Sequence, residues 1–163
     1  MAIEIRIARA NDTALILGFI RDLAEYEKLA HEVVADEAQL RATLFGVRPA
    51  AEVLIAELDG AAVGFALFFT NYSTFLGKPG LYLEDLFVRP AARSHGVGHA
   101  LMVKLAKLCV ERDYGRFEWA VLNWNEPAIK FYRSLGAQPQ TEWTVQRLTG
   151  DALATLADPS TIE

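Results

Sequence analysis

The stretch LYLEDLFVRPAARSHGVGHAL at residues 81–101 limits the possible folds more than any other part of the chain. It opens with a run that is apolar apart from Glu84 and Asp85, which predicts a largely buried strand. Pro90 ends this strand, because proline cannot donate a hydrogen bond to a ladder. From Ala100 onward apolar residues recur at three- and four-residue steps, which predicts a helix. The segment is therefore expected to form a strand, a loop and a helix in succession.

The loop between this strand and this helix carries Arg93, Gly96 and Gly98 in the spacing R-x-x-G-x-G. At the start of a helix, free backbone N–H groups and the helix dipole favour a bound anion. The loop has neither the G-x-x-x-x-G-K-[ST] run of a Walker phosphate loop nor the G-x-G-x-x-G run of a dinucleotide fold. Taken alone, it predicts either an anion site of another kind or a plain turn that uses two glycines.

A second motif, NWNEPAIKFYRSLG, spans residues 123–136. Asn125 is a favourable N-cap, and Pro127 falls in the first helical turn, where its missing N–H costs little. Gly136 is placed as a C-cap. The motif therefore predicts a short helix with defined ends.

The two motifs together resemble the GNAT superfamily of N-acetyltransferases, which bind acetyl-coenzyme A (acetyl-CoA). The R-x-x-G-x-G loop is similar to the pyrophosphate loop of that superfamily. Asn125, Ala128 and Tyr132 match its Asn-x-x-Ala-x-x-x-Tyr pattern, and Gly136 and Ala137 follow as in the family. Within the superfamily the chain looks most like the diamine and polyamine N-acetyltransferase branch. The segments that carry this likeness are LAEYE at 23–27, VGFALFF at 63–69, YLEDLFV at 82–88 and NWNEPAIKFY at 123–132.

The remaining patterns agree with the element order of that superfamily. We expect strands at 3–7, 53–58, 62–70, 81–88, 117–122 and 142–148, a hairpin turn at Asp59-Gly60, a turn at 77–80, and helices from Asn11 or Asp12 to about Leu29 and from Asp36 to Phe45-Gly46. The resemblance implies one α/β domain over residues 1–163. Its sheet should be mixed and mostly antiparallel, with splayed middle strands and helices on both faces.

The resemblance also implies a set of residues that bind acetyl-CoA. These are Leu86, Phe87 and Val88 on the strand, Arg93, Ser94, His95, Gly96, Val97, Gly98 and His99 in the loop, and Asn125 and Ala128 on the later helix. Leu86 and Val88 would pair with the pantetheine amides through backbone groups, like an added strand. Ser94 stands where the family usually has glycine. We expect it to be tolerated if its backbone angles suit an ordinary residue.

Acetyl transfer to an amine needs a base for the ammonium proton, a donor for the carbonyl oxygen and an acid for the leaving thiolate. Glu84 is the candidate base, acting through water, and Tyr132 is the candidate acid. The resemblance implies that Tyr26, Glu27 and Glu84 face the amine, although Tyr26 and Glu27 could also be the solvated end of an amphipathic helix. Asp85 is left outside the site, because consecutive residues of a strand face opposite ways. A structural ion pair at Glu84 and core packing at Tyr132 remain open as alternatives.

The acceptor is expected to be a small primary amine, either diamine-like or amino-acid-like. Polyamine enzymes carry an acidic residue and a tryptophan near Ser73 and Phe75, and their absence here argues against long polyamines. Two other readings stay open: a protein or peptide N-acetyltransferase, and a non-catalytic acyl-CoA-binding regulatory module. Retention of both Glu84 and Tyr132 favours the enzyme.

Composition limits the partners further. The net charge of −5 gives no basic surface for nucleic acid, so none is expected as a partner. No segment resembles a signal peptide or a membrane span, so a cytoplasmic protein without membrane contact is expected.

His31, His95 and His99 have no companions at metal-ligand spacing, so no metal is expected. The single Cys109 is expected in the core. By resemblance, a homodimer is expected to form through the strand at 142–148.

Overall fold

The computed structural model describes residues 1–161. The chain divides into two compact units, one at Met1–Leu122 and one that begins at Asn123. The first unit contains a sheet with helices α1, α2 and α3, and the second contains helices α4 and α5.

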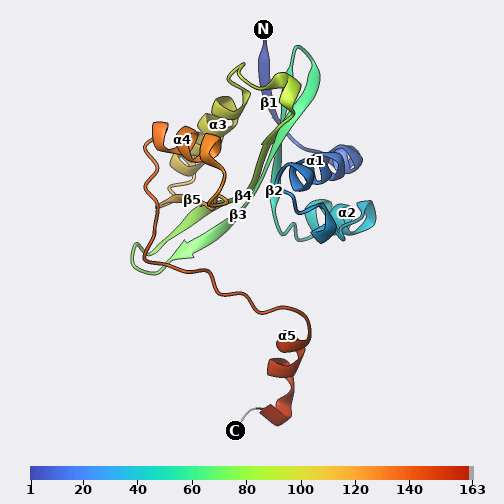
Figure 1. Ribbon diagram of the computed structural model, residues 1–163, viewed down its shortest axis with the longest axis vertical. Helices are drawn as coiled ribbons and strands as arrows, with labels where there is room; N and C mark the ends of the chain where they lie inside the picture. The colour runs from blue at the N-terminus through green and yellow to red at the C-terminus, as the bar shows by residue number, and fades with distance from the viewer. Residues whose placement is uncertain (162–163) are drawn as a thin grey trace. The chain divides into compact units, whose positions relative to one another are not determined.

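The first unit is built on a single sheet. Its strands, in the spatial order β1-β2-β3-β4-β5, span Ile3–Ile7 (β1), Glu52–Leu58 (β2), Ala61–Ser73 (β3), Lys78–Val88 (β4) and Phe117–Trp119 (β5). Neighbouring strands run antiparallel except β4 and β5, which run parallel (Figure 1). The expected mixed, mostly antiparallel sheet is therefore confirmed.

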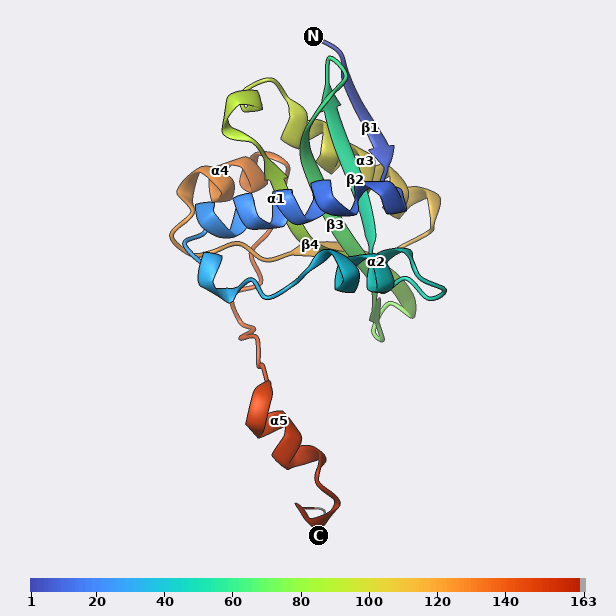
Figure 2. The ribbon, with the colours of Figure 1, turned by 90° about the vertical axis from the view of Figure 1, so that its right-hand side faces the viewer.

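Helices cover both faces of this sheet, as expected. The helices span Thr13–Tyr26 (α1), Glu37–Phe45 (α2) and Val97–Glu111 (α3), and short 3₁₀ turns lie at Ala10–Asp12, Ala30–Glu32 and Pro90–Ala92. Figure 2 shows α1 and α2 in front of the sheet and α3 behind it, and Figure 1 shows the same layers edge on. The face under α1 and α2 is therefore separate from the face under α3.

Apolar side chains at helical and strand spacing form the core of this unit. Phe19 of α1 is fully buried and stacks on Phe65 of β3, with ring centroids 5.4 Å apart. On the α3 face, Leu101 and Leu105 are fully buried. Cys109 is also buried, as predicted for a core residue.

The two hairpins test the predicted turns. Asp59 and Gly60 have φ values of 51° and 84°, as a type I′ turn requires, so that prediction is confirmed. The turn predicted at 77–80 lies earlier, because β3 reaches Ser73 and β4 already begins at Lys78. Gly80 belongs to the strand and pairs with Asn71, whose Oδ1 would lie 2.6 Å from any Cβ at that position. The glycine there allows close strand packing rather than a turn.

The ends of α1 differ from those expected. Asp12 does not cap the helix with its side chain but forms an ion pair with Arg6, at 2.8 Å. The helix ends at Tyr26 rather than Leu29, because Lys28 turns into the left-handed region with φ 62°. At α2, by contrast, the predicted start is confirmed: Asp36 precedes the helix and forms a reciprocal capping box with Gln39.

The second unit contains the predicted short helix, α4, at Glu126–Ser134. Asn125 caps its start by accepting a hydrogen bond from the N–H of Ala128, at 3.4 Å. At its end, the N–H of Gly136 donates to Arg133 O, at 3.0 Å, and the N–H of Ala137 donates to Tyr132 O, at 3.2 Å. With φ 91° at Gly136, these bonds form a Schellman motif. Both predicted caps are therefore confirmed.

Two predicted strands are wrong in whole or in part. The strand expected at 117–122 ends at Trp119, and residues 142–148 form no strand. A segment of alternating apolar residues forms a strand only when another strand pairs with it and buries one of its faces. Here the side chains of Trp143 and Val145 are 81% and 78% exposed, so neither is covered. The chain continues instead into α5 at Gly150–Ala157 and a 3₁₀ turn at Pro159–Thr161.

Candidate active site

The central strand β4 is interrupted at Glu84. Leu83 pairs with Phe68 of β3 and Asp85 pairs with the adjacent Leu67, so Glu84 is an extra residue that has no partner on β3. This is a β-bulge, a feature that often lies beside active sites. The ladder between β4 and β5 also ends here, at the pair of Leu83 and Trp119. The expected splay of the middle strands is thus matched by a ladder that stops just before Glu84.

Beyond the bulge, β4 exposes a row of backbone groups on the side where β5 has ended. The N–H of Arg89 donates to Val63 O of β3, at 2.8 Å. Backbone groups alternate in direction along a strand, so those of Val88 and Leu86 turn away from β3. An extended chain such as a pantetheine arm could pair with them as an added strand.

Three carboxylates gather at this interruption: Glu27, Glu84 and Asp85. Asp85 is half-buried, whereas Glu84 is exposed. Burial, and to a smaller extent the nearby charges of Glu84 and Glu27, raise the pKa of Asp85 to about 7. Burial also raises the pKa of Glu27, which directly follows α1. The site therefore holds three acids near enough for the charges of two of them to act on the third.

Asp85 is the residue that sequence reasoning left out of the site. The argument for leaving it out was strict alternation along the strand, and the bulge at Glu84 breaks that alternation. A bulge leaves no mark in the hydrophobic pattern of YLEDLFV. The signal that was present is chemical: of two adjacent carboxylates in an apolar strand, one must turn toward the interior and needs a function or a partner there.

The end of α1 contacts the loop that follows β4. The guanidinium of Arg93 lies over the ring of Tyr26, 4.8 Å from its centroid, and 5.4 Å from that of Phe87. Its Nε donates to Val88 O, at 2.8 Å. Arg93 is thus directed toward α1 and β4, and it links a candidate amine-side residue to the candidate cofactor loop. A carbonyl oxygen has two lone pairs, so Val88 can still accept a second hydrogen bond.

The glycine loop has the form of an anion site. Gly96 is the N-cap of α3, with φ 83°, and the first intrahelical bond runs from the N–H of Ala100 to Gly96 O, at 2.9 Å. The N–H groups of Val97, Gly98 and His99 precede that bond and have no intrahelical partner. Ser94, His95, Gly96 and His99 are exposed, while Val97 is buried and fixes the helix start. These features fit the pyrophosphate of acetyl-CoA.

Ser94 does not meet the condition set from the sequence. Its φ is 67°, in the left-handed region that favours glycine. A residue with a Cβ pays roughly 1–2 kcal/mol there. The loop is therefore strained at the position where the family usually has glycine.

We expect Ser94→Gly to raise the free energy of unfolding by up to about 1 kcal/mol, because relief of the strain is partly offset by the greater freedom of glycine in the unfolded chain. Urea denaturation of the two proteins would measure the gain. Gly96→Ala, at φ 83° in the same loop, is the matched control and should lower stability. A loss of stability in Ser94→Gly would contradict the strain.

The remaining candidates lie on α4 of the second unit. Asn125, Ala128 and Tyr132 are spaced by three and four residues, so they share one face of that helix. The ring of Tyr132 lies next to that of Phe131, with centroids 5.5 Å apart. The helix thus presents the amide, the small residue and the phenol together.

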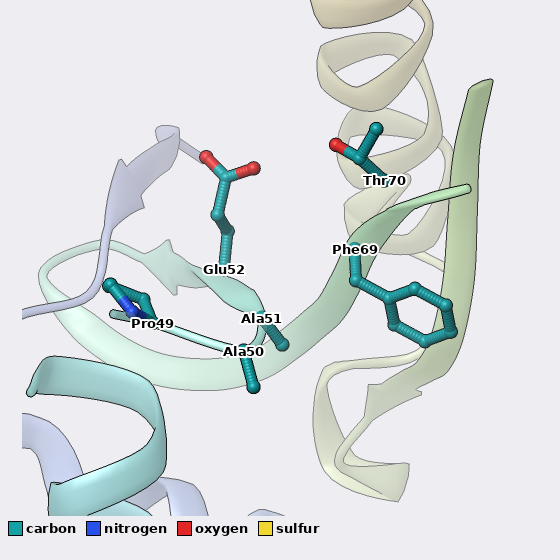
Figure 3. A pocket seen from close by; sticks show the side chains of 6 residues that line it. All are labelled: Pro49, Ala50, Ala51, Glu52, Phe69 and Thr70. Atoms are coloured by element: carbon teal, nitrogen blue, oxygen red, sulfur yellow. The ribbon is translucent and has the colours of Figure 1, made fainter. Parts of the chain in front are cut away.

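The described residues also form a pocket that none of the candidate site residues lines. A shallow pocket of about 290 Å³ is lined by Pro49, Ala50, Ala51, Glu52, Phe69 and Thr70 (Figure 3). Its one carboxylate, Glu52, is neutralised by two hydrogen bonds from Arg112, each 2.8 Å long. Within residues 1–161 no three His, Cys, Asp or Glu side chains are placed so that they could hold a metal ion, and no helix is long and apolar enough to cross a membrane.

Comparisons with known proteins agree with this geometry. The sequence model of the acetyltransferase (GNAT) family matches residues 19–137. A thialysine N-epsilon-acetyltransferase from Mus musculus is 40% identical, over 94% of this chain and 96% of its own length. An L-ornithine N5-acetyltransferase from Arabidopsis thaliana is 35% identical, over 92% of this chain and 86% of its own. An integron cassette protein from V. cholerae has a TM-score of 0.80 at 27% identity, covering 96% of this chain and 98% of its own. The chain belongs to the acetyltransferase (GNAT) family.

Proposed function

We propose that this acetyltransferase acts on the primary amine of a small amino-acid-like or diamine-like acceptor, with acetyl-CoA as the acetyl donor. The observation that carries the proposal is the gathering of Glu27, Glu84 and Asp85 where β4 loses its β5 partner. An alkylamine is an ammonium ion at neutral pH, because its pKa lies near the lysine value of about 10.4. Carboxylates close together at a partly buried site favour a cation between them.

The segment from β4 to α3 is proposed to hold acetyl-CoA, which supplies the activated thioester. The pyrophosphate would lie over residues 93–99, on the N–H groups at the start of α3. The backbone groups of Leu86 and Val88 would pair with the pantetheine arm, and Phe87 lies buried between them. Asn125 and Ala128 would contact that arm or the adjoining phosphates, a role supported by the family motif.

The proton of the ammonium group is proposed to leave through Glu84 and Asp85 together. Glu84 is exposed and can contact the acceptor or a water molecule bound to it. Asp85 is the better proton acceptor, because general-base catalysis is most efficient when the pKa lies near the working pH, and its pKa is about 7. Tyr26 and Glu27 would line the approach of the amine. This extends the role first given to Glu84 alone.

Two steps of the transfer remain, and each needs a group that donates a proton or a hydrogen bond. Tyr132 is proposed to protonate the departing thiolate, because a phenol stays protonated at neutral pH and can donate. A backbone N–H of β4 would meet the carbonyl oxygen as charge develops on it.

The identity of the acceptor is supported by two observations. The relatives are named for thialysine and L-ornithine, amino acids whose side chains end in an amine. Ser73, where polyamine enzymes tend to be acidic, is buried, and its hydroxyl accepts a hydrogen bond from the N–H of Leu76, at 3.2 Å. Ser73 therefore offers no charge to a distal ammonium group. A short acceptor is favoured over long polyamines, peptides and a non-catalytic role.

We expect the purified protein to release free CoA from acetyl-CoA faster with L-ornithine, thialysine or 1,4-diaminobutane than with spermine or a peptide, by about tenfold or more. A thiol-reactive dye would measure the release. Gly98→Phe is the control for the cofactor loop, since its side chain would obstruct the pyrophosphate. That variant should lose CoA affinity in calorimetry while its unfolding temperature stays unchanged. Equal rates with all acceptors would contradict the proposed specificity, and unchanged CoA affinity in Gly98→Phe would reject the loop.

Three further proposals follow from the family resemblance: one functional domain over residues 1–163, a cytoplasmic location, and a homodimer. The exposed apolar side chains of the C-terminal segment support the last of these. They include Trp143, Val145, Leu153 and Leu156.

A further inference from the structure

A polar strip continues from the candidate active site along the sheet face that α1 covers. Tyr82 lies two residues before Glu84 on β4, and its parallel partner on β5 is Glu118. Directly paired residues project to the same face of a sheet. Burial raises the pKa of Tyr82, and the charges of Glu84 and Glu118 raise it too, so both carboxylates lie near its hydroxyl. Glu118 is therefore the next charged group along this face.

Glu118 is joined to the side chain of Arg116, the residue directly before β5. Arg116 Nε lies 2.7 Å from Glu118 Oε1, and Asn71 Nδ2 donates to the same oxygen at 3.5 Å. Arg116 Nη2 also donates to Tyr72 O, at 3.3 Å. The pair is thus held in place from two directions, by β3 and by its own strand.

Both side chains of this ion pair can still bind a ligand. The side chains of Arg116 and Glu118 are 39% and 37% exposed. A guanidinium has five N–H donors, and the two contacts named above use two of them. A planar guanidinium suits a carboxylate, and a carboxylate suits an ammonium ion. A fixed pair of opposite charges therefore matches a zwitterion.

The spacing fits the two ends of a basic amino acid. Glu84 lies two residues beyond Tyr82 on β4, and Glu118 lies opposite Tyr82 on the neighbouring strand. With a rise of about 3.3 Å per residue and a strand separation of about 4.8 Å, the Cα atoms of the two glutamates are roughly 8 Å apart. An amine at the end of a short methylene chain can reach Glu84 while its α-carbon lies near Glu118.

We infer that Arg116 and Glu118 bind the α-amino-acid end of the acceptor, Arg116 taking the α-carboxylate and Glu118 the α-ammonium group. The inference rests on the proposed function and names the part of the site that selects the acceptor. It makes the enzyme prefer an amino acid with a side-chain amine over the diamine that lacks the carboxylate.

The test compares L-ornithine with 1,4-diaminobutane, which keeps both amines and lacks the carboxylate. Arg116→Met should lower kcat/KM for L-ornithine about 10- to 100-fold, the loss of a charge-assisted hydrogen bond, and should affect 1,4-diaminobutane much less. Glu118→Gln should weaken both acceptors. Lys78→Met, which removes another exposed ion pair on β4, with Asp113 at 2.9 Å, is the matched control and should change neither.

Binding of each acceptor in the presence of CoA, measured by calorimetry, gives a second readout that does not depend on turnover. Equal losses with both acceptors in Arg116→Met would make the pair structural and overturn the inference, as would unchanged values for L-ornithine. If the wild-type protein neither binds nor acetylates either acceptor, the proposed function itself fails. Activity with altered preference in Arg116→Met supports both.

Discussion

Replacing Asp85 by asparagine should stabilise the protein at pH 8 and at the same time slow acetyl transfer. The pKa of this carboxyl is raised from 3.8 to about 7, chiefly by burial. Below pH 3.8 it is protonated in both the folded and the unfolded chain, so it costs nothing. As the pH rises toward 7, only the unfolded chain ionises, and stability falls. Above pH 7 the full cost remains, about 2–4 kcal/mol, and asparagine removes it.

Urea denaturation at pH 4 and pH 8 separates this effect from a change in packing. Asp85→Asn should gain most of its stability at pH 8 and little at pH 4. Asp113→Asn, at an exposed partner of Lys78, is the control and should show no such gain. Equal gains at both pH values would mean that Asp85 is not held above its ordinary pKa.

The loss of activity in the same variant has a separate reason. Asparagine cannot accept the ammonium proton, and general-base assistance is typically worth roughly 10²–10⁴-fold. In the wild-type protein, kcat/KM should rise through about pH 7 as Asp85 ionises. Asp85→Asn should lose that rise along with the rate. A buried acid that lowers stability and supports the reaction is expected where function opposes stability.

Much of the fold follows from local signals in the sequence. Asp59-Gly60 specifies its turn because both residues tolerate positive φ, as observed. Asn125 and Gly136 specify the two ends of α4 because each satisfies backbone groups that the helix leaves open. The succession of strand, glycine loop and helix after residue 81 is likewise local. Each of these features needs only a few neighbouring residues.

The features that the sequence could not predict depend on distant partners. The bulge at Glu84 arises from the register between β3 and β4, which a single strand pattern does not contain. Residues 142–148 alternate like a strand, but no other strand pairs with them, so they form none. The strain at Ser94 depends on how α3 begins. Asp85 belongs with these, since its burial follows from the bulge.

The second large effect is expected on the step in which the thiolate of CoA leaves. If Tyr132 protonates the departing thiolate, Tyr132→Phe should lower kcat by roughly 10²–10⁴-fold when that departure limits the rate. CoA affinity should change little, because the ring remains and only the hydroxyl is lost. The matched control is Tyr114→Phe, which removes a hydroxyl that lies 2.8 Å from Thr70 Oγ1 and should leave kcat unchanged.

The pH profile distinguishes an acid from a packing residue. A general acid must be protonated to act, so kcat of the wild-type protein should fall at high pH as the phenol ionises, and Tyr132→Phe should lose this fall. A residue that only packs would lower kcat by the same factor at every pH and would also lower the unfolding temperature. Steady-state kinetics from about pH 7 to pH 10, with acetyl-CoA and L-ornithine, would measure kcat of both proteins below and within the pH range of this fall. Full activity in Tyr132→Phe would show that the thiolate leaves without an acid.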